Sequence, residues 1–129
     1  MSEADRADLH AGLELFNAGE YWESHEAWER IWQRHTEPWR FFIQGLIQAA
    51  AAHHQLRRGI QYGAIKHLKN ALAKLEVAPP DFAGLALEEF RAHLRKLVMQ
   101  IENLKPREFT ASKNLEVASL RWSASPAPL

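Results

Sequence analysis

The sequence predicts an all-α protein, a compact five-helix bundle, and three observations point to it. Apolar residues recur at intervals of three and four almost throughout the 129 residues, and no stretch alternates as a β-strand would. Glycines and prolines divide this pattern into segments of helical length. Hydrophobic residues make up 47% of the chain, which is enough to bury the core of one domain.

The first two helices flank Gly19. The first ends before Asn17, and the second runs from about Glu20 to His35. Glycine suits the turn between them because it adopts left-handed backbone conformations without strain. Their apolar stripes comprise Leu9, Leu13 and Phe16 in the first helix and Tyr21, Trp28, Ile31 and Trp32 in the second.

The third and fourth helices flank Gly59 in the same way. Pro38 suits the first turn of the third helix, which reaches Arg58. The fourth helix follows directly. Their stripes comprise Trp39, Phe42, Ile43, Leu46, Ala50 and His53, and then Ala64, Ile65, Leu68, Ala71, Leu72 and Leu75.

A fifth helix follows the break at 78–84, which reads APPDFAG, and its stripe comprises Phe90, Leu94, Leu97, Ile101 and Leu104. We therefore expect a helical bundle domain over residues 1–104. Residues 105–129 mix small polar residues and prolines with few apolar anchors. They are expected to form a flexible tail, or an extended arm that lies on a partner.

An internal repeat relates the helices. When the sequence is aligned with itself so that Gly19 matches Gly59, the second helix matches the fourth. The other matched pairs are Ser24 with Ala64, Trp28 with Leu68, Ile31 with Ala71 and Trp32 with Leu72. A glycine, a small residue and a large apolar residue at these spacings are also typical of tetratricopeptide helix pairs. The bundle is therefore expected to consist of two tetratricopeptide-like hairpins, capped by the fifth helix.

Composition limits the function classes. The 16 basic and 16 acidic residues are interleaved, so no basic patch indicates nucleic acid or a membrane surface. The chain has no cysteine, which leaves His, Asp and Glu as the strong metal ligands and suits a cytoplasmic protein. No cofactor motif is visible. A protein partner or a homodimer is the expected assembly.

Residues 16–32 read FNAGEYWESHEAWERIW, with glutamate at Glu20, Glu23, Glu26 and Glu29. Each step of three turns the side chain by about 60° backwards, so the four carboxylates wind around the helix and cannot all meet one ion. Glu23 and Glu26 point away from the stripe centred on Trp28. They are expected to face solvent, with Glu26 paired to Arg30 one turn on.

Glu29 differs because it lies one turn after His25, at the border of the apolar stripe. Such a pair is a structural contact, a general acid/base dyad or two ligands of a metal. The structural interpretation is favoured. The segment HEAWE resembles a zincin helix but has Glu29 where the second histidine should be, which weakens the metal interpretation.

The third helix adds polar residues to this candidate site. Gln44 and Gln48 lie one turn apart, and Gln in a mostly apolar helix needs a partner. His53 lies on the apolar stripe and is expected to be a core histidine. Antiparallel packing of the second and third helices would bring His54 near His25. The predicted polar pocket comprises His25, Glu29, Gln48, His54, Glu26, Glu23 and Gln44, with His25, Glu29 and His54 as candidate ligands of a divalent metal.

These residues also carry a family resemblance. The segments FNAGEYWESHEAWERIW and FIQGLIQAAAAHHQLRRGIQYGAIKHL resemble the small all-helical family named domain of unknown function 309, over roughly residues 9 to 104. The resemblance implies a compact helical bundle without an established activity. Its motif residues correspond here to Phe16, Asn17, Gly19, Tyr21, Glu23, His25, Glu26, Trp28, Glu29, Trp32, Gly45, Gln48, His54, Gly59, Gly63 and Ala64. Ala86 stands where members usually carry an acid.

Two functional hypotheses follow, and the sequence leaves open whether the protein is an enzyme. The first is a binding or interaction module with a polar pocket between the second and third helices. The alternative is a small metal-dependent or acid/base hydrolase that uses His25, Glu29 and His54.

Overall fold

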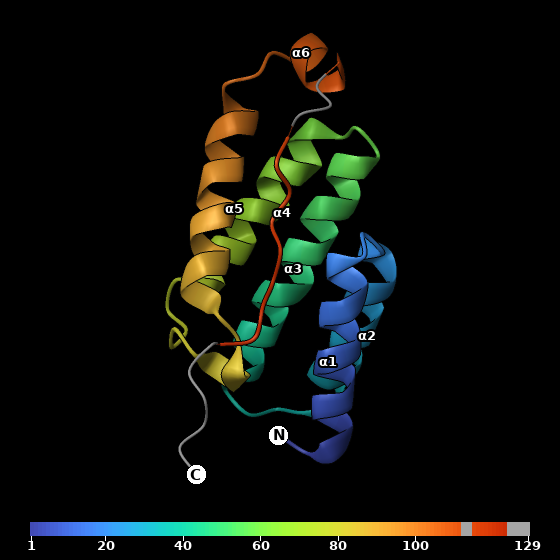
Figure 1. The fold of residues 1–129 in the computed structure, drawn as a ribbon, viewed down its shortest axis with the longest axis vertical. Helices are drawn as coiled ribbons and strands as arrows, with labels where there is room; N and C mark the ends of the chain where they lie inside the picture. The colour runs from blue at the N-terminus through green and yellow to red at the C-terminus, as the bar shows by residue number, and fades with distance from the viewer. Residues whose placement is uncertain (112–114, 124–129) are drawn as a thin grey trace.

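The computed structural model describes residues 1–111 and 115–123, and it is a helical bundle (Figure 1). Within these residues the elements are α1 (Glu3–Asn17), α2 (Tyr21–Arg34), α3 (Arg40–Arg57), α4 (Gln61–Leu75), the 3-10 turn η1 (Phe82–Gly84), α5 (Leu87–Glu102) and α6 (Pro106–Ala111). The prediction of five packed helices is confirmed. No helix in the described ranges is long and apolar enough to span a membrane.

The turns of the two hairpins are the same turn. Gly19 and Gly59 both have positive φ, at 82° and 73°. After α1, the amides of Gly19 and Glu20 donate to the carbonyls of Phe16 and Leu15, and the equivalent amides and carbonyls pair in the same way after α3. Both helices therefore end in the glycine motif that the sequence predicted. The internal repeat is confirmed, and its likeness to tetratricopeptide repeats stays a prediction.

Close backbone approach sets the packing inside each hairpin. A Cβ on Gly12 would lie 2.1 Å from Nε1 of Trp28, so the Trp28 indole occupies the space that any larger residue would need. In the second hairpin a Cβ on Gly45 would lie 2.9 Å from the Leu75 side chain. Ser24 adds a buried hydrogen bond, with its hydroxyl donating to the Gly12 carbonyl at 2.8 Å.

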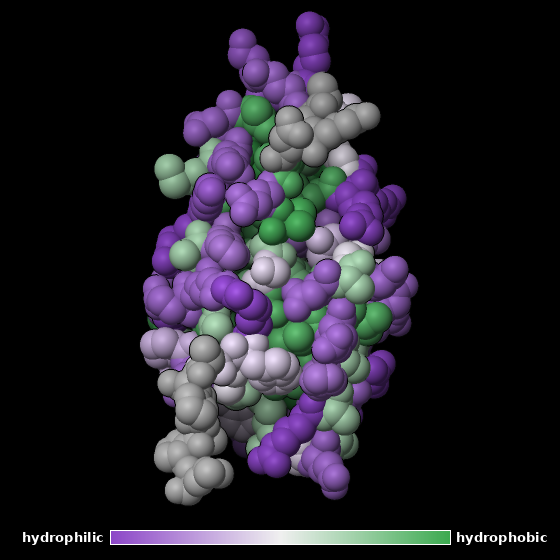
Figure 2. Space-filling model, viewed as in Figure 1, coloured by the Kyte–Doolittle hydropathy of each residue, from purple (hydrophilic) through white to green (hydrophobic). Residues whose placement is uncertain are grey.

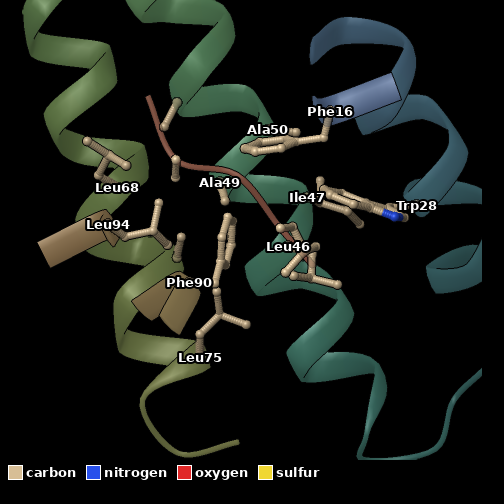
Figure 3. Close-up of a cluster of buried hydrophobic side chains, with 14 of the residues drawn as sticks. Phe16, Trp28, Leu46, Ile47, Ala49, Ala50, Leu68, Leu75, Phe90 and Leu94 are labelled. Atoms are coloured by element: carbon tan, nitrogen blue, oxygen red, sulfur yellow. The ribbon is translucent and has the colours of Figure 1, made fainter. Parts of the chain in front are cut away.

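One hydrophobic core joins the two hairpins and α5 (Figure 3). Phe16 and Trp28 enter it from the first hairpin, and Leu46 and Leu68 from the second. Phe90 of α5 meets Phe16 edge to face, with ring centroids 5.7 Å apart. The fifth helix therefore closes the open apolar side, as predicted.

Helices α4 and α5 satisfy each other's ends. Arg91 is 5% exposed, and its guanidinium donates to the carbonyls of Leu75 and Ala78 at 2.7 and 2.9 Å, after the last turn of α4. Gln61, at the start of α4, donates in turn to the carbonyls of Ile101 and Leu104. Carbonyls at a helix end have no partner within the helix, so these side chains fix the two helices together.

The described residues between 106 and 123 differ from the flexible tail or partner-bound arm that we expected. Residues 106–111 form α6, and residues 115–123 run extended along the bundle of this same chain (Figure 1). Figure 2 shows patches of hydrophobic residues down the middle of this face, with polar residues between them. Ala118 and Leu120 are 3% and 0% exposed, so the segment 115–123, which we call the arm, contributes to the core. Residues 112–114 and 124–129 lie outside the described residues.

Side-chain clamps explain why the arm docks. Nδ2 of Asn17 donates a hydrogen bond to the Leu120 carbonyl at 2.7 Å, and Oδ1 of Asn17 accepts one from the Leu120 amide at 2.9 Å. Nε2 of His53 accepts the Ala118 amide at 3.2 Å, and beyond Leu120 the Ser123 amide donates to a carbonyl of the η1 turn. Extended backbone needs such partners when it is buried.

Candidate functional site

The candidate site is built on the first turns of α2, where Trp22 organises two histidines. The Trp22 ring stacks on His25 with centroids 4.9 Å apart and planes 6° apart. His54, at the end of α3, meets the same indole at 5.3 Å. Helices α2 and α3 thus bring His25 and His54 to one aromatic ring. Trp22 itself remains 48% exposed.

His25 and Glu29 form the i,i+4 contact that their spacing predicts. Nδ1 of His25 lies 3.5 Å from Oε2 of Glu29, which allows an ion pair when His25 is protonated but is no hydrogen bond. The His25 side chain is 18% exposed and that of Glu29 is 42% exposed. The pair therefore lies at the border between core and solvent.

Sequence reasoning missed His67, which approaches this site from α4. Burial first, and then the nearby Lys66 and His25, lower the pKa of His67. Its Nδ1 is buried without a hydrogen-bond partner. The signal that could have found it is the antiparallel arrangement of α3 and α4, which returns α4 alongside the end of α3 that carries His54.

Glu23 and Glu26 face solvent, in agreement with the helical wheel. Glu26 was expected to pair with Arg30, and this is wrong: Arg30 pairs instead with Asp8 of α1, at 3.1 Å. A tertiary partner competes with the local one, and the helical spacing alone does not reveal it. Neither Glu23 nor Glu26 forms an ion pair with the part of the chain that the structure describes.

Gln44 and Gln48 lie elsewhere and do not join the histidines. Gln48 accepts a hydrogen bond from Nζ of Lys74 at 2.9 Å, so its partner is on α4. Gln44 lines a small depression of about 260 Å³ together with Trp32 and Phe41, near the start of α3. Of the predicted pocket, the structure brings together His25, His54 and Glu29, the first two against Trp22 and the third against His25. Glu23 and Glu26 are exposed residues of the same helix. We call Trp22, Glu23, His25, Glu26, Glu29 and His54 the Trp22 surface.

The three candidate metal ligands do not form a metal-binding group. Within residues 1–111 and 115–123, no three His, Cys, Asp or Glu side chains are placed to hold one ion. His25 and Glu29 contact each other, while His54 contacts the indole of Trp22 from the end of α3. The geometry therefore gives no support to a metal at His25, Glu29 and His54.

His53 is the core histidine that the sequence predicted. Its Nδ1 donates to the Ala49 carbonyl at 2.8 Å, and its Nε2 accepts the Ala118 amide. This arrangement requires the neutral ring, because Nε2 must keep a lone pair. Burial lowers the pKa of His53 to about 4, against 6.5 in water.

A polar network at the opposite end of the first hairpin was not predicted. Asp5 is fully buried, and its carboxylate accepts from Nε of Arg34 at 2.9 Å and contacts Nε2 of His35 at 2.5 Å. Burial alone would raise its pKa, but hydrogen bonds from Ser2, Arg34 and His35 outweigh burial and hold the pKa of Asp5 well below its ordinary value. This network joins the start of α1 to the end of α2, which is a structural role.

Comparisons with known proteins agree with the family resemblance. Residues 9–67 match the model of a family described as "Domain of unknown function (DUF309)". The chain is also 31% identical, over 94 residues, to a curated relative from Aquifex aeolicus (strain VF5) described as an uncharacterized protein. That match covers 72% of this chain and 28% of the relative, so the chain spans less than a third of the relative's length. The resemblance to the DUF309 family is therefore confirmed over residues 9–67.

Proposed function

We propose that the protein is a binding module whose Trp22 surface holds a basic segment of a partner protein. The observation that carries the proposal is the indole of Trp22, which is 48% exposed and fixed against His25. Exposed aromatic side chains of this size are typical of recognition surfaces. Because stacking already restricts the ring, binding would cost little further conformational entropy.

The carboxylates around Trp22 indicate the chemistry of the partner. Glu26 and Glu29 lie four and seven residues after Trp22, on the same face of α2, and Glu23 follows it directly. Arg57, the last residue of α3, lies near the start of α2. It already donates a hydrogen bond to the Gly19 carbonyl at 2.8 Å and packs over the Tyr21 ring. The balanced charge of the whole chain hides this local excess of acid. An aromatic face beside carboxylates suits a lysine or arginine side chain.

Hydrolysis by His25, Glu29 and His54 is the weaker candidate. Its one supporting observation is the 3.5 Å contact between His25 and Glu29. A catalytic base also needs a nucleophile or a metal-bound water within reach. The described ranges contain no metal-binding group that would supply such a water, so we favour binding.

A peptide titration tests the proposal. We would titrate the ¹⁵N-labelled protein with a blocked hexa-arginine peptide and follow the indole and amide signals by NMR. We expect saturable shifts centred on Trp22 and His25. The Trp22→Ala variant should lose them. Shifts spread over the whole surface would contradict the proposal.

A charge-matched control separates a site from general attraction. The double variant Glu23→Gln, Glu26→Gln should bind the peptide about tenfold more weakly, which corresponds to about 1.4 kcal/mol. The double variant Glu102→Gln, Glu116→Gln removes the same charge from exposed lysine pairs elsewhere and should bind like the parent. Equal weakening by both variants would refute a local site.

The nature of the partner and the compartment stay predictions. Sedimentation of the parent and of Trp22→Ala tests whether the partner is a second copy of the chain. A cytoplasmic location and a tetratricopeptide-like role of the hairpins are consistent with binding a protein segment, and they follow from composition and from the repeat alone.

A further inference from the structure

We propose that a second site, a cavity of about 680 Å³ beside the first turns of α1, binds a small organic acid with an aromatic or otherwise apolar body. This site is independent of the Trp22 surface and shares no residue with it. The residues that carry the argument are Arg6, Leu9, His10, Trp39, Phe82 and Trp122. Cavities of a few hundred to about 1,000 Å³ are the usual size for small-molecule sites.

The walls of the cavity are aromatic and come from four separate parts of the chain. Trp122 of the arm stacks on His10 of α1, with centroids 5.9 Å apart and planes 12° apart. Phe82 of the η1 turn is supported by an edge contact with Phe42 at 5.1 Å. Trp39, just before α3, is backed by the ring of His35 at 4.8 Å. The walls therefore keep their shape without a ligand, which favours binding.

The arm and the η1 turn hold Trp122 in this position. The Ser123 amide donates to the Gly84 carbonyl at 2.7 Å, and the Ala86 amide donates to the Arg121 carbonyl at 2.8 Å. Trp122 nevertheless remains 40% exposed. The fold thus secures the backbone of the arm while it leaves a partly exposed indole at the cavity, where the ring is available to a ligand.

Arg6 gives the cavity its chemical preference. Arg6 lines the cavity, and its guanidinium forms no ion pair or side-chain hydrogen bond with residues 1–111 and 115–123. A free guanidinium beside aromatic walls is suited to a carboxylate, sulfonate or phosphate, which it can hold with two parallel hydrogen bonds. The start of α1 does not supply the anion site, because Ser2 and Asp5 already cap it. The ligand class is therefore an apolar ring or chain that carries one anionic group.

The backbone beside the cavity is strained. Ala83 lines the cavity with a φ of 55°, a left-handed conformation that is strained for a residue other than glycine. Strain of this kind is concentrated at ligand sites. It adds an observation that is independent of the charge and of the aromatic walls.

The test uses two probes of similar shape and different charge. The anionic probe is 8-anilinonaphthalene-1-sulfonate, and the neutral one is N-phenyl-1-naphthylamine. We expect the parent to bind the anionic probe in a saturable manner, with one probe per chain. Arg6→Met should weaken binding of the anionic probe about tenfold, equivalent to about 1.4 kcal/mol, and leave binding of the neutral probe unchanged. Trp122→Ala should weaken the binding of both probes.

Two control variants decide between the proposal and its competitors. Arg58→Met removes an exposed arginine that forms no ion pair with the described residues, and it should change neither probe. Equal effects of Arg6→Met and Arg58→Met, or binding of several probes per chain, would overturn the proposal. The chain's own residues 124–129 follow Ser123 and are the alternative occupant. The variant Leu129→Asp should bind the probe like the parent, whereas tighter binding would identify this segment as the occupant and overturn the proposal.

Discussion

The two hairpins of the bundle, α1–α2 and α3–α4, have the same backbone turn and different chemistry. Each hydrogen bond of the turn after α1 has a counterpart at the equivalent positions of the turn after α3. The side chains around the turns share little beyond Gly19 and Gly59. A hairpin geometry therefore depends on a few positions where space or φ is restricted, and the remaining positions are free to serve other purposes.

At the open ends of the two hairpins, equivalent positions carry different polar pairs. Asp8 pairs with Arg34 at 2.8 Å across the first hairpin, and Gln48 pairs with Lys74 at 2.9 Å across the second. Since 8 and 48 are equivalent, as are 34 and 74, these two pairs occupy the same place. Gln48, a predicted pocket residue, is thus explained by the hairpin and need not face a ligand.

Replacing Gly12 by alanine has the largest expected effect, because it breaks the tightest contact of the first hairpin. The new Cβ would lie 2.1 Å from the Trp28 indole, and overpacking of this kind costs about 3 kcal/mol. The equivalent residues in the second hairpin are Ala52 and Leu68, both fully buried. The double variant Gly12→Ala, Trp28→Leu copies that pair and should be more stable than the sum of the single variants predicts. Urea unfolding measures this, and strict additivity would contradict it.

Acid should weaken the second hairpin through His53, whose equivalent in the first is Leu13. The folded-state pKa of about 4 lies below 6.5, so the unfolded state binds the proton first. Stability is unaffected above pH 6.5 and falls between pH 6.5 and 4, by about 3 kcal/mol in total. Unfolding curves at several pH values measure the loss.

Two variants control for other titrating groups in that experiment. His53→Gln should be less stable at neutral pH but lose most of this pH dependence, while His54→Gln should keep it. The remainder is expected from His67, whose pKa is also lowered by burial. The buried carboxylate of Asp5 affects stability in a separate pH range. Because its pKa is lowered in the folded state, its stabilising contribution is lost only as the pH falls below 3.8, the pKa of the unfolded state. A pH dependence in His53→Gln as steep as that of the parent would show that another group is responsible.

A smaller effect is expected from exchanging Ser24 and its equivalent Ala64. Ser24→Ala removes the buried hydrogen bond to the Gly12 carbonyl and should cost about 1 kcal/mol. Ala64→Ser should cost no more than about 1 kcal/mol, since the repeat places the Ala52 carbonyl where the new hydroxyl can donate. Thermal unfolding of both variants tests this. A clearly larger loss in Ala64→Ser would mean that the hairpin interiors differ more than their turns.

The smallest expected difference is between Gly19→Ala and Gly59→Ala. Both residues have positive φ, and alanine at either should cost about 1 kcal/mol. At Gly19 the Cβ would also lie 2.8 Å from Nη2 of Arg57, whereas at Gly59 it meets nothing within 4 Å. Arg57 is exposed and can move, so the excess should be a few tenths of a kcal/mol. In an Arg57→Ala background the two losses should become equal, and a persisting excess would place its cause elsewhere.

The helices and their turns were predictable because local rules decide them. Apolar spacing gave the helices, and Gly19 and Gly59 gave the stops. The arm was not predictable in this way, because the apolar residues of the segment LEVASLRW are interrupted by Glu116, Ser119 and Arg121 and are too few to identify an element. Its docking depends on Asn17 and His53, far away in sequence, and no period reveals such contacts.

The candidate site was predictable only where one helix or one hairpin decides it. The contact of His25 with Glu29 follows from i,i+4 spacing, and the approach of His54 follows from antiparallel packing. The stacking of Trp22 and the approach of His67 depend on how side chains pack between helices, which spacing does not give. Whether these residues bind a partner stays a prediction.

The link between Asn17 and Leu120 also has a consequence for synthesis on the ribosome. It closes a loop of 103 residues, so both hairpins can emerge and fold before the arm has been translated. During that interval the Asn17 amide and Nε2 of His53 lack their partners, and the apolar seam on which the arm docks is open. A nascent chain paused before Leu120 should therefore be the form most exposed to chaperones, and to strands of other chains that could take the arm's place.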